Sequence, residues 1–415
     1  MGSPAPRSLL VELLVEELPP KNLKRLGSAF AEALAASLQA QGLADDDAEV
    51  VPFATPRRLA VRIAAVRERA ADRAVSHKLM PASVGLDAAG AATPALLKRL
   101  AALGADAASV ARLQRRIDGK NETLFLDGVA AGATLAEGLQ RALDEAIARL
   151  PIAKVMQYQL ADGWTSVSFV RPAHGLLALH GSDVVAVSAL GLAAGRSTLG
   201  HRFESPLPTI AIRDAGSYEA QLRDDGAVVA SYAERRAEIA RQLAVAASAV
   251  SLTPIDDEAL LDEVNSLVER PNVLTCRFDA DFLEVPPECL VLTMKANQKY
   301  FPLLDAAGKL TDRFLVVSNI TPADPSRVIE GNERVVRPRL ADARFFYDQD
   351  RKKTLASRVP ALDKVVYHGK LGSQGERVGR VRAMARWVAE RIGADPALAD
   401  RAALLAKADL LTDMV

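Results

Sequence analysis

The chain has 415 residues, which is long enough for two or three domains that each bury a hydrophobic core. Apolar residues make up 49% of the chain and charged residues 25%, as in ordinary globular proteins. Its 52 basic residues balance 52 acidic ones, whereas dedicated nucleic-acid modules are usually basic overall. Any nucleic-acid role must therefore depend on local basic patches.

Cysteine usage argues against a zinc protein, and hydropathy argues against a membrane or secreted protein. Cys276 and Cys289 lack a histidine or another cysteine at metal-ligand spacing, so we expect no zinc site. The apolar stretch at 9–18 is interrupted by three glutamates, which is not typical of a signal peptide or a membrane span. We therefore expect a cytoplasmic protein with no membrane partner.

The first predicted domain, residues 1–150, is an α/β unit. Hydrophobic periodicity and turn residues predict its elements. The expected strands are 8–15, two strands within 50–66 around a turn at 55–58, and 123–129, and the expected helices are 21–41, 93–103 and 134–150.

The second predicted domain, residues 151–330, combines long helices with many strands, which favours an α+β domain with a mixed sheet. The expected strands are 164–170, 176–179, 184–190, 209–212, 273–278, 290–294 and 314–317, and the expected helices are 217–224 and 233–250.

The third predicted domain, residues 331–415, is helical. We expect a helix that opens at Pro338, because proline suits the first helical turn. The expected helices are 340–358, 375–392 and 396–415. The last of them carries no stop signal, so we expect Val415 to be a cut within a longer chain.

Polar side chains are unusually dense between residues 285 and 353. One group interrupts the predicted strand at 290–294, and another precedes the predicted helix. The two groups are Lys295, Asn297, Gln298, Lys299 and Tyr300, and Asn332, Glu333, Arg334, Arg337 and Arg339. Such a density predicts either a bound anion or a polar lock between domains.

Several basic residues stand in these and similar motifs, and arginine and lysine both suit phosphate. The candidates for RNA contact are Arg57, Arg58, Arg171, Arg202, Lys295, Lys299, Arg334, Arg337 and Arg339. The alternative is that they form ion pairs with acidic residues and so hold the domains together. For Arg334, Arg337 and Arg339 this alternative is slightly favoured, because acidic residues are interleaved with them. The pair Arg57 and Arg58, in a turn with no neighbouring acid, is the better RNA candidate.

The aromatic residues of the third domain have two interpretations. Phe345, Phe346 and Tyr347, like Phe301 before them, could stack on bases, but Leu340, Ala343 and either Phe346 or Tyr347 fall at the spacing of a helix core. We therefore expect them to pack inside.

We predict no catalytic or metal-binding residue. The chain has no glycine-rich phosphate loop of standard pattern, because the glycines of 191–200 have the wrong spacing. It also has no His-Asp doublet.

Motifs along most of the chain resemble the beta subunit family of bacterial heterotetrameric glycyl-tRNA synthetase. They include LLVELLVEELPP (9–20), FATPRRLAV (53–61), FVRP (169–172), GHRF (200–203), QKYFP (298–302), GNERV (331–335) and LAKADLLTDMV (405–415). The resemblance implies a central domain similar to part of the phenylalanyl-tRNA synthetase beta subunit. It also implies a helical domain similar to the HD superfamily, whose active members bind metals through a His-Asp doublet.

The resemblance further implies a division of labour. The alpha subunit would hold ATP and magnesium and attach glycine to its tRNA. The beta subunit would bind and orient the tRNA without a cofactor of its own, in a complex of two alpha and two beta subunits. The alternatives are an HD-type metal-dependent phosphohydrolase, which the missing doublet disfavours, and a pure protein scaffold.

Overall fold

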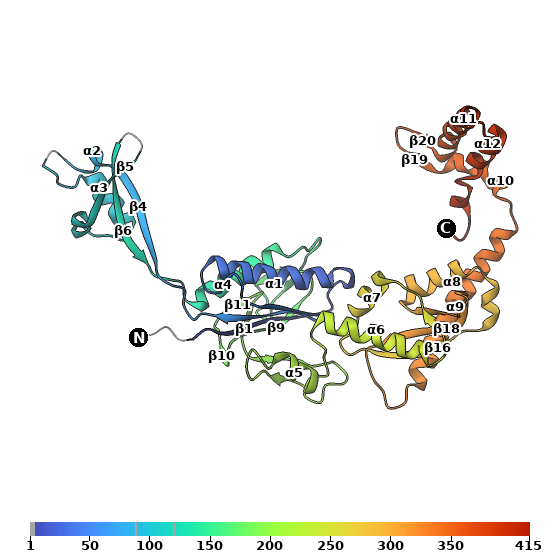
Figure 1. Ribbon diagram of the computed structural model, residues 1–415, viewed down its shortest axis with the longest axis horizontal. Helices are drawn as coiled ribbons and strands as arrows, with labels where there is room; N and C mark the ends of the chain where they lie inside the picture. The colour runs from blue at the N-terminus through green and yellow to red at the C-terminus, as the bar shows by residue number, and fades with distance from the viewer. Residues whose placement is uncertain (1–4, 88, 119–120) are drawn as a thin grey trace. The chain divides into compact units, whose positions relative to one another are not determined.

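The computed structural model describes residues 5–87, 89–118 and 121–415. It divides into two compact units, Met1–Tyr232, coloured from blue to green in Figure 1, and Ala233–Val415, coloured from yellow-green to red. The expectation that the chain combines helices with several sheets is confirmed. The division differs from the predicted boundaries after residues 150 and 330, because β9 (Ala173–His180) pairs with β1 (Arg7–Val15) in one sheet.

The first unit is built on a five-stranded antiparallel sheet in the order β10-β9-β1-β3-β2. The other strands are β2 (Val50–Thr55), β3 (Arg58–Val66) and β10 (Asp183–Val184). The central strand β1 is buried from Leu9 to Val15. Both faces of the sheet are covered, which explains why the sequence of β1 is almost continuously apolar.

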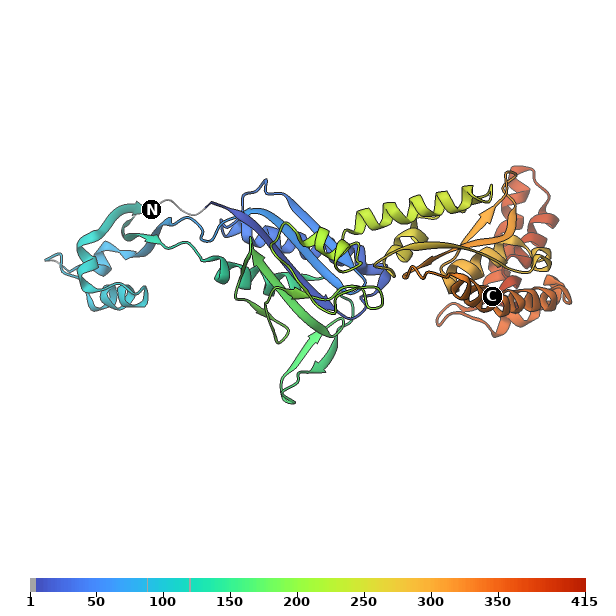
Figure 2. The ribbon, with the colours of Figure 1, turned by 90° about the horizontal axis from the view of Figure 1, so that it is seen from below.

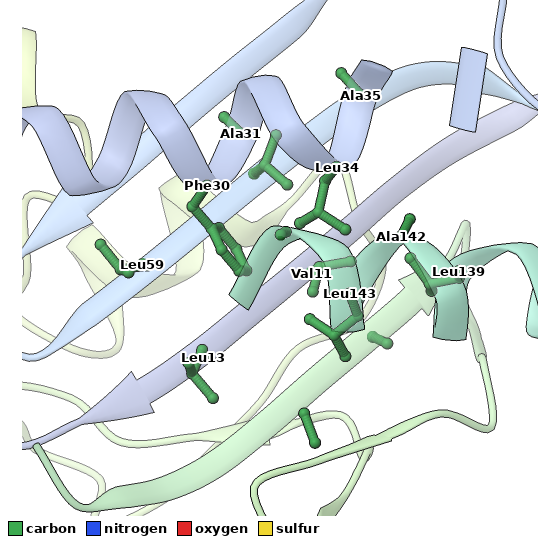
Figure 3. Packing of buried hydrophobic residues seen from close by; sticks show 14 of the residues in the cluster. Val11, Leu13, Phe30, Ala31, Leu34, Ala35, Leu59, Leu139, Ala142 and Leu143 are labelled. Carbon is green, nitrogen blue, oxygen red and sulfur yellow. The ribbon is translucent and has the colours of Figure 1, made fainter. Parts of the chain in front are cut away.

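Helices α1 (Leu23–Ala40) and α4 (Leu135–Arg149) cover one face (Figure 3). Phe30 and Leu34 of α1 and Leu143 of α4 pack on the strands around Leu13. A capping box at Thr134 fixes the start of α4, where the Thr134 hydroxyl accepts the N–H of the third helical residue.

The opposite face carries a second core beneath α5 (Tyr218–Asp224) and the short pair β13 (Ser197–Thr198) and β14 (Ile210–Ala211). Phe53 and Tyr218 meet edge to face, with ring centroids 5.2 Å apart. Figure 1 shows α5 and the pair α1 and α4 on opposite sides of the sheet.

A smaller subdomain is inserted between β3 and α4. Its three-stranded antiparallel sheet, in the order β4-β6-β5, packs on short helices over a core that includes Leu96, Leu100 and Leu124. The elements are β4 (Arg73–Pro81), α2 (Ala82–Gly85), α3 (Pro94–Ala102), β5 (Leu113–Asp118) and β6 (Asn121–Ala130). A hairpin of β7 (Met156–Gln159) and β8 (Ser166–Phe169) follows α4.

The second unit contains a four-stranded antiparallel sheet in the order β15-β17-β18-β16. Its strands are β15 (Thr253–Pro254), β16 (Asn272–Arg277), β17 (Phe301–Leu304) and β18 (Leu310–Ser318). Helices α6 (Tyr232–Ser248) and α7 (Glu258–Asn265) pack on it through a core that includes Ile239, Val264 and Leu315 (Figure 2).

A second cluster joins this sheet to α8 (Pro287–Thr293) and α9 (Ser326–Arg351) through Phe314, Leu290 and Leu340. The predicted strand at 290–294 is wrong, because these residues form α8 and the start of a π-helical turn (Met294–Gln298). A short apolar run suits a buried helix as well as a strand, and Pro287 at the first turn favours the helix.

Pro338 does not open a helix but lies inside α9, so that prediction is also wrong. Its ring is on the exposed side of the helix, and Val336 and Leu340 are buried on either side of it. The packing of these neighbours holds α9 continuous although proline lacks the N–H for one intrahelical hydrogen bond.

The last residues form shorter helices than predicted. They also include a hairpin of β19 (Val366–His368) and β20 (Gly372–Ser373), so the prediction of an entirely helical third domain is wrong. The expected helix 340–358 stops at Arg351, and the expected helix 396–415 stops at Leu405. The pieces are α10 (Leu355–Arg358), α11 (Gln374–Ile392), α12 (Pro396–Leu405) and a 3₁₀ turn (Ala408–Leu411).

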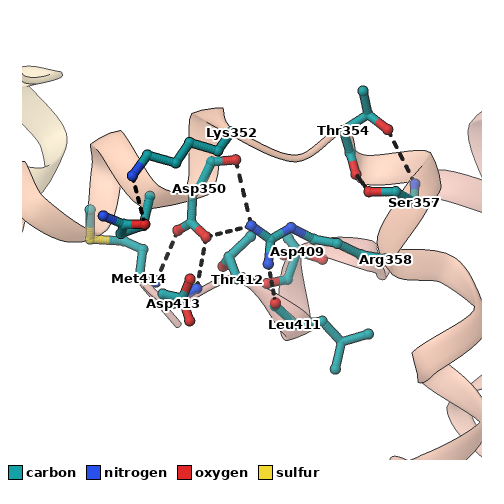
Figure 4. Close-up of polar contacts among 11 residues, drawn as sticks. Asp350, Lys352, Thr354, Ser357, Arg358, Asp409, Leu411, Thr412, Asp413 and Met414 are labelled. Atoms are coloured by element: carbon teal, nitrogen blue, oxygen red, sulfur yellow. Dashed lines mark hydrogen bonds and ion pairs between the residues drawn. The ribbon is translucent and has the colours of Figure 1, made fainter.

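Asp350 ties the end of this segment to the end of α9 (Figure 4). Its carboxylate accepts hydrogen bonds from the Arg358 guanidinium (2.7 Å) and from the N–H groups of Asp413 (2.8 Å) and Met414 (3.0 Å). Arg358 also donates to the Leu411 carbonyl. No helix among the described residues is long and apolar enough to cross a membrane.

Candidate nucleic-acid interface

Several of the motif segments meet in the first unit around a cleft of about 460 Å³. Its wall combines the end of β1 with Arg57 in the turn between β2 and β3. His174 near the start of β9 and the loop 199–208 after β13 complete it. Residues far apart in the sequence are therefore brought together at one place.

Arg58 lies beneath this cleft and is fully buried, at 0% exposure. Its Nε lies 3.4 Å from Oε2 of Glu12, a residue of β1 that is itself 1% exposed. The expectation that no acid neighbours Arg57 and Arg58 is therefore wrong. Glu12 is distant in sequence, and the pairing of β1 with β3 brings it alongside.

The hydrogen bonds of Arg58 and Glu12 extend into the loop that forms the cleft. Arg58 donates to the Leu199 carbonyl and to the Thr55 hydroxyl. Glu12 accepts from the hydroxyls of Thr198 and Tyr218. The buried pair thus holds the start of the loop 199–208 against the sheet.

Arg57 has a related position at the cleft. It is 8% exposed, and its guanidinium donates to the Gly200 carbonyl at 2.8 Å. Both arginines of the FATPRR motif therefore donate to backbone carbonyls of the loop 199–208, which contains the GHRF motif and is called the GHRF loop below. Arg57 also lines the cleft.

Glu16 and Arg202 lie at the mouth. Glu16 contacts His174 Nε2 at 3.0 Å and Arg202 at 3.3 Å, and Arg202 also approaches Glu17 at 3.4 Å. Desolvation acts to raise the pKa of Glu16, but hydrogen bonds with Glu17, His174 and Arg202 outweigh it and hold the pKa below its ordinary value. Glu16 is therefore ionised at neutral pH.

Arg171 of the FVRP motif is exposed, and its Nε donates to the Glu17 carbonyl at 2.8 Å. Sequence reasoning missed Glu16, which lines this cleft, and Phe203, which lies on the loop that forms its wall. Phe203 follows Arg202 and is 76% exposed. The GHRF motif, which the sequence already singled out, was the available signal for Phe203.

We expect Glu12→Ala to lower the free energy of unfolding by about 3–5 kcal/mol, because the buried Arg58 charge loses its carboxylate. Urea-induced unfolding followed by circular dichroism measures this. The matched control is Glu49→Ala, which removes a 66% exposed carboxylate 3.7 Å from Arg62 and is expected to change stability by less than about 1 kcal/mol. Equal losses in the two variants would contradict the role of the buried pair.

In the second unit, Lys295 lies in the π-helical turn and Lys299 is the residue that follows its end. Lys295 pairs with Asp257 at the start of α7, and Lys299 lies 3.1 Å from Glu263 of the same helix. Lys299 has a φ of 58°, a left-handed conformation that costs energy outside glycine. The two ion pairs hold this turn against α7.

The arginines of α9 have a different environment. Arg334, Arg337 and Arg339 are exposed, and the Nε of Arg337 lies 3.7 Å from Asp279. Three of the four acids expected to pair with this group, Glu333, Asp342, Asp348 and Asp350, have other partners. Glu333 accepts the N–H of Arg277, Asp348 lies 4.0 Å from Arg344, and Asp350 binds Arg358.

The aromatic residues of α9 divide between core and surface. Phe345 and Phe346 are 56% and 38% exposed, so the expectation that they pack inside is wrong. Tyr347 packs against the core around Leu340, as expected. The surface of α9 therefore combines arginines with exposed phenyl rings, which is the chemistry that binds RNA phosphates and unstacked bases.

Burial at the QKYFP motif has a measurable consequence. Burial, with a smaller contribution from Cys276, raises the pKa of Tyr300 to about 12, and its hydroxyl donates to Asn332 at 2.8 Å. The folded state thus holds the phenol proton more tightly than the unfolded state. The stability that this group contributes is intact below about pH 10 and is lost as the pH rises towards 12.

We expect a titration of absorbance at 295 nm to show one phenolate forming near pH 12 that Tyr300→Phe lacks. The matched control is Tyr367→Phe, which removes a 39% exposed ring and should leave that late step in place. A step near pH 12 with the same amplitude in Tyr300→Phe as in the wild type would contradict the assignment.

No group of three or more His, Cys, Asp or Glu side chains in the described part of the chain is placed to hold a metal ion. Among the described residues, basic and aromatic side chains gather at the cleft beside the GHRF loop and on the surface of α9. They belong to different units.

Comparison with known proteins gives the family. The model of the family described as glycyl-tRNA synthetase beta subunit matches residues 9–415. The chain belongs to this family.

Three similar proteins, each named glycine–tRNA ligase beta subunit, match nearly the whole chain. The protein from Leptothrix cholodnii is 67% identical over 98% of this chain and 59% of its own length. The one from Thiobacillus denitrificans is 66% identical over 98% and 58%, and the one from a Janthinobacterium species 64% over 99% and 59%. The chain thus spans less than two thirds of the length of these relatives.

Proposed function

We propose that this chain acts as the tRNA-binding part of a glycine–tRNA ligase beta subunit. It would bind and orient glycine tRNA, while an alpha subunit that holds ATP and magnesium attaches the glycine. The observation that carries this proposal is the family match over residues 9–415. A cytoplasmic complex of two alpha and two beta subunits is part of the same proposal.

The contribution of a non-catalytic subunit is positional. Holding the acceptor end of the tRNA at the active site of another subunit makes a bimolecular transfer effectively unimolecular. Phosphate contacts suit this task, since they fix the register of the RNA without reading its sequence.

Exposure separates the candidate residues into two groups. Arg334, Arg337 and Arg339 are exposed on α9, the helix that also exposes Phe345 and Phe346, so we propose them as the main RNA contacts. Arg171 and Arg202 are exposed near the cleft of the first unit and would contribute there. The buried or paired members, Arg57, Arg58, Lys295 and Lys299, support these surfaces by holding loops in place.

We also propose that two regions of the chain are related to parts of other protein families. The central region would be related to part of the phenylalanyl-tRNA synthetase beta subunit, and the helices after α9 to the HD superfamily. The alternatives to tRNA binding are a phosphohydrolase activity and a scaffold that binds only proteins. A measurement of RNA binding distinguishes the tRNA-binding proposal from both.

We expect the triple variant Arg334→Ala, Arg337→Ala, Arg339→Ala to bind glycine tRNA more weakly and with a smaller salt dependence. Each lost phosphate contact lowers the slope of log K against log salt by about 0.7–0.9, so the slope should fall by about two to three. Fluorescence anisotropy across a salt series, with and without the alpha subunit, measures both quantities.

The control replaces three exposed arginines that pair within their own helices, Arg149, Arg223 and Arg241, by alanine. It makes the same change in net charge, and the slope should stay close to that of the wild type. If the wild-type chain binds no tRNA in either condition, the proposed function is wrong. An unchanged slope in the α9 variant would remove α9 from the RNA site.

A further inference from the structure

We propose that the cleft of the first unit holds one unpaired nucleoside of the bound RNA, with the base inside and the phosphates outside. This inference rests on the proposed function and names the chemical group that the cleft would take. Four features of the cleft support it: its size and walls, an unpartnered buried donor, an exposed aromatic ring at its loop, and the charge at its mouth.

The size and walls suit a small, largely apolar group. The cleft has a volume of about 460 Å³, within the range of about 300–1,000 Å³ typical of small-molecule sites. Leu14, Val15, Leu199, Leu207 and Pro208 provide apolar surface. A flat base can bury its faces against such walls.

His201 supplies a buried hydrogen-bond donor at the cleft. Its ring is 2% exposed, and its Nδ1 accepts the N–H groups of Phe203 (3.2 Å) and Glu204 (3.1 Å). Because Nδ1 is an acceptor, the ring proton is on Nε2. Nε2 has no hydrogen-bond partner among the described residues. A buried donor left unsatisfied costs free energy, which an acceptor on a bound ligand would recover.

Phe203 supplies a stacking surface at the same loop. Its ring is 76% exposed and lies 6.2 Å from the His201 ring, centroid to centroid. The loop is held by hydrogen bonds from Arg57 to Gly200 and from Arg58 to Leu199. Aromatic rings displayed in this way stack on unpaired bases in RNA-binding proteins.

The charge at the mouth favours a nucleoside over a phosphate inside the cleft. The Arg202 charge is already met by Glu16 and Glu17, and the ionised Glu16 would repel a phosphate. A carboxylate instead accepts hydrogen bonds from ribose hydroxyls or from an amino group on a base. The phosphates would therefore remain outside the cleft.

The test compares the affinity of the chain for glycine tRNA and for a short single-stranded RNA in the wild type, Phe203→Ala and Trp164→Ala. Trp164 is a matched control, since it is an 89% exposed aromatic residue of the same unit, at the tip of the β7–β8 hairpin. Both substitutions remove exposed rings and leave the cores intact.

We expect Phe203→Ala to weaken binding of both RNAs by about 5- to 100-fold, the range typical of one lost base-stacking contact. Its salt slope should match the wild type, since no phosphate contact is lost, and Trp164→Ala should bind as the wild type does. Phe203→Ala binding with wild-type affinity, or a reduced salt slope, would overturn the nucleoside assignment alone. A wild-type chain that binds neither RNA, with or without the alpha subunit, would overturn the proposed function as well.

Discussion

The buried guanidinium of Arg58 is the constraint on which the first unit depends. A charge with no access to water must be matched by a carboxylate and by hydrogen-bond acceptors, because its desolvation is otherwise very costly. Glu12 in the central strand supplies the carboxylate, and the Leu199 carbonyl and the Thr55 hydroxyl supply acceptors. The sheet, the β2–β3 turn and the loop 199–208 are therefore held in one arrangement.

This arrangement explains why motifs far apart in the sequence belong together. Glu12 of the first motif and the arginines of the second meet the loop of the GHRF motif. That loop brings His201 and Arg202 to one cleft and displays the exposed Phe203 next to Arg202 in the chain. In the second unit, ion pairs from Lys295 and Lys299 hold a left-handed turn beside Tyr300 in the same way. Buried or paired cations thus position the surfaces, and the exposed cations and rings are the groups that we propose contact RNA.

The sequence predicted what depends on local pattern and missed what depends on pairing across the fold. The amphipathic helix α1 and the strand β1 have clear periodicity and were predicted close to their observed bounds. The helix α8 was taken for a strand, because a short apolar run has no distinct period. The burial of Arg58 and the exposure of Phe345 depend on residues from other elements, which no local pattern displays.

The most direct test of this account is a photo-crosslinking measurement at the GHRF loop. A photoreactive benzoylphenylalanine replaces Phe203, the chain is mixed with glycine tRNA and the alpha subunit, and the crosslinked RNA is quantified and mapped. Replacement of Trp164 by the same residue gives the background of an exposed aromatic position. The account predicts strong crosslinking from position 203 to an unpaired nucleotide. Crosslinking from position 203 no stronger than from position 164 would contradict it.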